Sequence, residues 1–80
     1  MKVSILTFGA TRDIMQTDRM ELELNDHAKV QDLRKQLEEK HPELERLNSL
    51  FVAVNEEYAE GDQTLNEGDV VALIPPVSGG

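Results

Sequence analysis

The chain has 80 residues, which fits one domain that buries only about 60% of the surface of its unfolded chain. So small a core leaves little room for an enclosed active site, which favours a binding or carrier module over a free-standing enzyme. The chain has 16 acidic and 8 basic residues, which gives a formal net charge of -8. Such a surface repels nucleic acid and anionic membranes and favours a basic partner. The alternative is that the charge only keeps a small protein soluble.

The composition also limits the chemistry of the chain. There is no cysteine, which excludes a disulfide framework, a thiolate metal site, a cysteine nucleophile and a persulfide on the chain itself. We interpret His27 and His41 as exposed structural residues, because no cluster of further ligands accompanies them, and we predict no metal site and no cofactor bound by this chain. No stretch has the form of a signal peptide or the length of a membrane span, which predicts a cytoplasmic location.

The first part of the chain predicts an antiparallel pair of strands. Residues 2–8 begin with alternating side chains, but Leu6 and Phe8 make the second face of this strand apolar as well. Residues 9–16 fit a helical turn or a structured loop. In residues 19–24 apolar and acidic side chains alternate cleanly, which is typical of a half-buried strand with one face in water.

A helix is predicted from about Lys29 to Lys40, after a loop at 25–28. Its apolar side chains recur at i, i+3 and i+7, and the positions between them are polar. Pro42 disfavours helical geometry at the residue before it, so the helix should end there. The apolar stripe consists of Val30, Leu33 and Leu37, and a short turn that closes one end of the core is indicated by Leu44, Leu47 and Leu50.

The second half of the chain predicts three more strands. Residues 51–54 form a short apolar strand, 55–57 a turn and 58–59 a small edge strand, and Leu65 lies between two turn signals as a core residue. Residues 70–74 are the most apolar run, which suits a strand in the middle of a sheet. This order predicts an α+β fold of the β-grasp type, a mixed sheet with one main helix on one face and the last strand parallel to the first.

The last six residues cannot continue the sheet. Two prolines remove backbone donors and fix φ, so the strand should end at about Ile74 and the exit should be stiff. The rest of the tail has small side chains and could thread a narrow channel in another protein. We predict one domain over 1–80 whose flexible tail inserts into partners and ends in a reactive Gly80 carboxylate that needs no processing; a frayed terminus is the alternative. The tail consists of Pro75, Pro76, Val77, Ser78, Gly79 and Gly80.

The run from Gly68 to Gly80 resembles the C-terminal signature of the small subunits of molybdopterin synthase, a family of ubiquitin-like sulfur carriers. The specific part is the pattern Gly-Asp-x-Val, followed by Pro-Pro-Val-x-Gly-Gly. Thiamin sulfur carriers, tRNA-thiolating modifiers and ubiquitin-like proteins share a bare Gly-Gly end, whereas the Pro-Pro pair fits the molybdopterin branch best. The resemblance covers the whole chain and includes Phe8, Arg12, the predicted helix and residues 52–55.

The resemblance implies a sulfur-carrier function in molybdenum cofactor biosynthesis. An E1-like adenylating enzyme would use ATP to activate the Gly80 carboxylate, and a sulfur donor would then leave a thiocarboxylate there. The large subunit of molybdopterin synthase would receive the tail in a heterotetramer, supply the catalytic residues and direct the sulfur to a cyclic pyranopterin precursor. A carrier for thiamin or tRNA thiolation, a ubiquitin-like protein modifier and an interaction domain with an inert tail remain alternatives.

Apolar positions on both faces of the first and last strands predict a docking surface. One helix covers only one face of the sheet, so part of this apolar surface must lie away from it. We predict the docking surface at Phe8, Leu73 or Ile74, with Arg12 at its rim as a charged anchor. The alternative is a second small core under residues 9–16 and 58–65.

Overall fold

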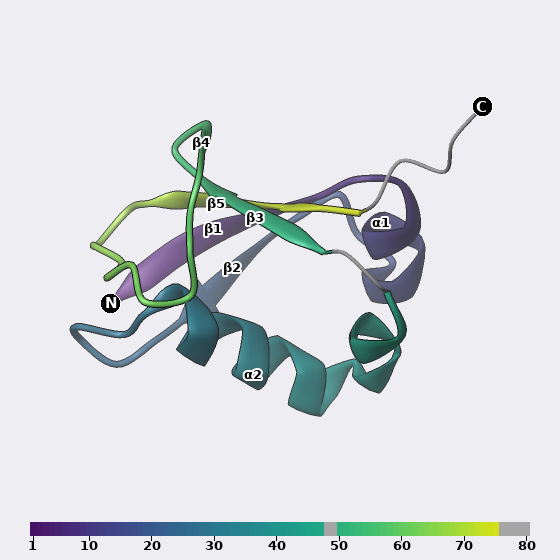
Figure 1. Ribbon diagram of the computed structural model, residues 1–80, viewed down its shortest axis with the longest axis horizontal. Coiled ribbons are helices and arrows are strands. Elements are labelled where there is room, and N and C mark those ends of the chain that lie inside the picture. Colours follow the sequence, from purple (N-terminus) through teal and green to yellow (C-terminus); the bar gives the residue numbers. More distant parts are fainter. Residues whose placement is uncertain (48–49, 76–80) are drawn as a thin grey trace.

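A five-stranded mixed sheet with one long helix on one face forms the body of the protein (Figure 1). The computed structural model describes residues 1–47 and 50–75. The strand order is β2-β1-β5-β3-β4, with β5 in the centre and parallel to β1, as predicted. The elements are β1 (Lys2–Thr7), α1 (Gly9–Met15), β2 (Arg19–Glu23), α2 (Val30–Lys40), the 3₁₀ turn η1 (Pro42–Arg46), β3 (Phe51–Val54), β4 (Glu57–Tyr58) and β5 (Val70–Ile74).

The core lies between the sheet and α2. Ile5 of β1 pairs with Val71 of β5, and both side chains are fully buried against the apolar stripe of the helix. Residues whose Cα atoms are partners across two strands share a face, so one face of the sheet faces α2. Leu65 is buried as predicted, and it lies with Met15 in the same cluster as the helix side chains. The alternative of a second core under 9–16 and 58–65 is therefore wrong.

The hairpin between β3 and β4 is tighter than predicted. Asn55 and Glu56 form its two-residue turn with φ of 51° and 73°, the left-handed geometry that joins twisted antiparallel strands with little splay. The edge strand therefore starts at Glu57 instead of at Tyr58. The side chain of Asn55 extends the pairing toward β5, because its Oδ1 accepts a hydrogen bond from Val70 N at 3.0 Å.

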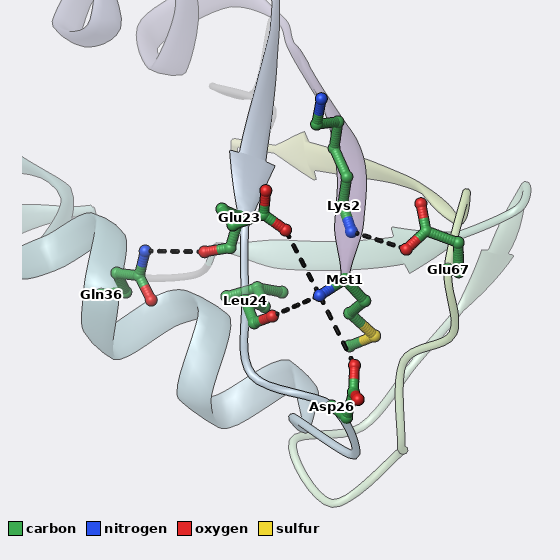
Figure 2. A network of polar contacts seen from close by, with 7 residues as sticks. All are labelled: Met1, Lys2, Glu23, Leu24, Asp26, Gln36 and Glu67. Atoms are coloured by element: carbon green, nitrogen blue, oxygen red, sulfur yellow. Dashed lines mark hydrogen bonds and ion pairs between the residues drawn. The ribbon is translucent and has the colours of Figure 1, made fainter.

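A polar network holds the start of β1 against the end of β2 (Figure 2). The Met1 amino group donates to Leu24 O at 2.7 Å and lies 3.3 Å from a Glu23 carboxylate oxygen and 3.5 Å from one of Asp26. Leu24 N donates in return to Met1 O at 2.8 Å, so the pairing of the two strands continues by one residue. In the part of the chain that the structure describes, no helix is long and apolar enough to cross a membrane.

Candidate functional site

The tail leaves the sheet at the end of β5, next to α1 (Figure 1). The strand ends at Ile74 and Pro75 follows, as the prolines predicted. Gly9, with a φ of +51°, lies close to Pro75, since a Cβ added to Gly9 would lie 3.4 Å from Pro75 Cγ. The predicted reactive Gly80 and the other insertion residues Pro76, Val77, Ser78 and Gly79 lie outside the described residues.

Thr11 contacts the base of the tail, a role that the sequence does not predict. Its side chain is fully buried, its Oγ1 accepts a hydrogen bond from Phe8 N at 2.9 Å, and it lies 3.0 Å from Leu73 O as a donor. In a capping box the side chain at the third helical position accepts a hydrogen bond from the N-cap amide, as Thr11 does here. The sequence does not show this, because a box is recognised by Ser or Thr at the N-cap and Glu or Gln at the third position, and the contact with β5 has no local signature.

An apolar patch crosses the face of the sheet that points away from α2. Strand register aligns Leu6 of β1 with Ala72 of β5, Ala72 with Ala53 of β3, and Ala53 with Tyr58 of β4. Phe51 and Ile74 form the adjacent row on the same face, at the end of β5 where the tail begins. We define the open-face patch as Leu6, Phe51, Ala53, Tyr58, Ala72 and Ile74.

Two aromatic rings form the exposed part of this patch. The side chains of Phe51 and Tyr58 are 52% and 74% exposed, and their rings meet edge to face with centroids 5.8 Å apart. A contiguous exposed apolar surface of this kind is typical of a protein interaction site. Phe51 and Tyr58 were not predicted as binding residues, because a short strand followed by a turn does not reveal which of its side chains point away from the helix.

The predicted docking residues separate into two groups. The prediction that Leu73 is a docking residue was wrong. Leu73 is 0% exposed and packs in the core under α2, because it is one of the alternate residues of β5 that point toward the helix. Ile74, one residue later, is half-buried on the open face. Phe8 is 49% exposed and its extended backbone puts it on the side of Leu6, while Arg12 is exposed on α1. The binding roles of Phe8, Arg12 and Ile74 stay predictions.

The charge around the open-face patch differs between its two sides: the exposed Arg19 of β2 is the strand partner of Leu6, whereas the side of β3 and β4 is acidic. Residues 51–80 contain no Lys or Arg, and Glu56 and Glu57 lie directly before the exposed Tyr58. A basic rim on the opposing surface would complement this side of the patch and speed encounter. The carboxylates of this segment are Glu56, Glu57, Glu60, Asp62, Glu67 and Asp69.

The histidines lie in separate surroundings. His27 is exposed in the loop before α2, where it adopts a φ of +69°, and His41 is the half-buried C-cap of that helix. Within residues 1–47 and 50–75, no three His, Asp or Glu side chains form a group that could hold a metal ion.

The central strand that continues into a proline-led tail beside an apolar face defines a ubiquitin-like carrier domain. The ThiS family matches residues 5–80, and the chain belongs to that family. Two relatives named molybdopterin synthase sulfur carrier subunit are similar over the whole chain. The protein from Chlamydomonas reinhardtii is 36% identical over 100% of both chains, and that from Mycobacterium tuberculosis is 39% identical over 100% of this chain and 99% of its own.

Solved structures of similar proteins have the same fold. A putative molybdopterin converting factor subunit 1 from Pyrococcus furiosus is 30% identical, with a TM-score of 0.86 over 95% of this chain and 98% of its own. SAMP1 of Haloferax volcanii is 27% identical, with a TM-score of 0.87 over 100% of both chains. A complex of subunits 1 and 2 of molybdopterin-converting factor from Helicobacter pylori contains a chain that is 28% identical, with a TM-score of 0.72 over 100% of both chains. The β-grasp prediction is thereby confirmed.

Proposed function

We propose that the chain is the sulfur carrier subunit of a molybdopterin synthase and that its Gly80 carboxylate carries the sulfur. The observation that supports this most is the likeness over the full length to proteins of that name, at 36% and 39% identity. The fold adds a physical reason, since its central strand leads directly into the tail and an exposed apolar patch adjoins the exit. In this proposal the catalytic groups belong to the partner proteins.

The chemistry follows from the poor reactivity of a carboxylate. A Gly80 carboxylate oxygen attacks the α-phosphorus of ATP on an E1-like adenylating enzyme, and pyrophosphate leaves. Hydrosulfide then adds to the acyl carbon and AMP leaves, which gives the thiocarboxylate. In the synthase this sulfur forms a bond to a carbon of the cyclic pyranopterin precursor as an oxygen of the precursor departs, and water cleaves the acyl–sulfur bond to restore the carboxylate. ATP is abundant in the cytoplasm, and a cytoplasmic location belongs to the same proposal.

Both partners would dock on the open-face patch. The large subunit is one, in keeping with the Helicobacter pylori complex of subunits 1 and 2. A partner seated on Phe51, Ile74 and the adjoining Phe8 would receive the tail directly, because Ile74 is the last residue before Pro75. Arg12 would lie at the rim of this contact. Replacing Phe8 by alanine tests this: if the fold weakens while the affinity of the folded protein for the large subunit is unchanged, the docking role of Phe8 is wrong.

The intact mass of the protein tests the central claim. After incubation with the activating enzyme, ATP and a sulfide source, the mass should rise by the difference between one sulfur and one oxygen atom, and a variant that lacks Gly80 should not change. An unchanged mass of the intact chain would refute the carrier function. Sulfur transfer to the pterin precursor with the large subunit present identifies the molybdopterin pathway, whereas conjugates on lysines of other proteins would identify a modifier instead.

A further inference from the structure

The pairing between β1 and β5 ends in an unusual way beside the tail. At its start, Ser4 N donates to Asp69 O at 2.9 Å. A parallel ladder repeats every two residues along both strands, so four residues further on Phe8 N should donate to Leu73 O. Phe8 N instead donates to Thr11 Oγ1 at 2.9 Å, and this hydroxyl lies 3.0 Å from Leu73 O. The hydroxyl of Thr11 is inserted into the last rung of the ladder.

The carbonyl of Leu73 depends on this hydroxyl. On the β3 side, Asn55 N donates to Val70 O at 2.8 Å, and hydrogen-bonded pairs alternate with non-bonded pairs along an antiparallel ladder. The pair of Val52 and Leu73, three residues along, is therefore non-bonded, and Leu73 O points toward β1. Both Thr11 and Leu73 are 0% exposed, so water cannot readily replace the hydroxyl, and an unpaired buried carbonyl is unfavourable.

A second acceptor lies near the same hydroxyl. Phe8 O is 2.7 Å from Thr11 Oγ1, but it already accepts a hydrogen bond from Thr11 N at 3.0 Å. Because a hydroxyl has one proton, donation to Leu73 O leaves every one of these backbone groups with a partner. The arrangement that satisfies them all is the one in which Thr11 joins α1 to β5.

We propose that Thr11 is a positioning residue that fixes the direction in which the tail leaves the domain. Leu73 lies two residues before Pro75, whose ring fixes φ, so the placement of Leu73 is passed on to the tail through a stiff segment. Gly9 at the start of the same helix also lies beside Pro75, since a Cβ added to it would be 3.4 Å from Pro75 Cγ. The inference rests on the proposed function, since the direction of the tail affects a reaction only if Gly80 reacts in the active site of a partner.

The chain offers matched variants for a test. Thr11→Val keeps the shape of the side chain and removes the hydroxyl, and Thr11→Ser keeps the hydroxyl. Thr7→Val is the control, because Thr7 is also buried and is the strand partner of Leu73, but its hydroxyl donates to Thr17 O in the loop before β2. Thiocarboxylate formation by the activating enzyme is measured at varied carrier concentration. Thr11→Val should lower kcat about 10-fold with KM unchanged, since a misdirected reacting group loses rate while the open-face patch still docks. Thr11→Ser should restore most of kcat, and Thr7→Val should leave it unchanged.

A second readout does not depend on any reaction. Thr11→Val should speed amide hydrogen exchange at Phe8 and increase the backbone motion of Ile74 measured by ¹⁵N relaxation, and Thr7→Val should change neither. A wild-type kcat for Thr11→Val, an effect on KM alone, or an equal loss of kcat in Thr7→Val would overturn the positioning role. If the wild-type chain gains no sulfur at all, the proposed function is wrong, and the relaxation of Ile74 alone then decides whether Thr11 holds the base of the tail.

Discussion

Replacing Phe51 by alanine should weaken docking far more than it weakens the fold. The side chain is 52% exposed, and a phenylalanine offers about 200 Å² of surface, so a partner on the open-face patch would cover about 100 Å² of it. At about 25 cal/mol per Å² this gives about 2.5 kcal/mol, of which alanine retains a small part. We therefore expect the dissociation constant for the large subunit to rise about 30-fold, which corresponds to about 2 kcal/mol.

Isothermal titration calorimetry at fixed salt measures this affinity, and urea unfolding measures the cost to the fold. The fold should lose only about 1 kcal/mol, mainly from the edge-to-face contact with Tyr58. Lys35→Ala is the control, because Lys35 is exposed on α2, which covers the other face of the sheet. The affinity of this variant for the large subunit should stay at the wild-type value. Equal affinities of Phe51→Ala and Lys35→Ala would show that the patch is not the docking surface.

Three further predictions concern stability, and urea unfolding measures each. Asn55→Ala should destabilise by about 1 kcal/mol more than Asn55→Gly, because alanine resists the φ of 51° and glycine does not; equal losses would contradict this. Burial lowers the pKa of the Met1 ammonium, but the hydrogen bonds and charges of Glu23 and Asp26 raise it by more, so its pKa lies above the ordinary value. The free energy by which this ammonium stabilises the fold should be fully present below a pH of about 8 and should be lost as the pH rises through the raised pKa. In Glu23→Gln the free energy of unfolding should fall less over the same pH range. Leu33→Ala should cost about 3 kcal/mol, since the side chain is fully buried, and a loss as small as that of Lys35→Ala would refute its place in the core.

The sequence predicts the order of the elements well and the faces of the central strand poorly. The stripe of Leu33 and Leu37 has helical spacing, and both side chains are buried as predicted. In contrast, residues 70–74 are apolar throughout, so no period in the sequence reveals which of them point toward α2. The register with β1 and β3 decides this, and it buries Leu73 while Ile74 lies on the open face.

Thr11 was missed for a related reason. Its hydrogen bond to Leu73 O joins residues that are 62 positions apart, and only the folded sheet brings them together. A threonine between an alanine and an arginine has no local feature that distinguishes a structural hydroxyl from a solvated one. Patterns along the chain predict the elements and their order. They do not predict a contact between two elements, such as the one between α1 and β5, because that contact depends on how the elements pack.

Two polar clusters lie at opposite ends of β1, and we expect one to affect stability and the other to affect sulfur transfer as well. The network of Met1 and Glu23 lies at the start of the strand (Figure 2), while Thr11 and Phe8 lie at its end beside the base of the tail. Mutations at sites without shared partners usually have additive effects. A double variant of Glu23→Gln and Thr11→Val should therefore show the sum of the two losses in unfolding free energy and only the kcat loss of Thr11→Val. A kcat lower than that of Thr11→Val alone would mean that β1 couples its two ends, and the tail could then no longer be treated as positioned by α1 and β5 alone.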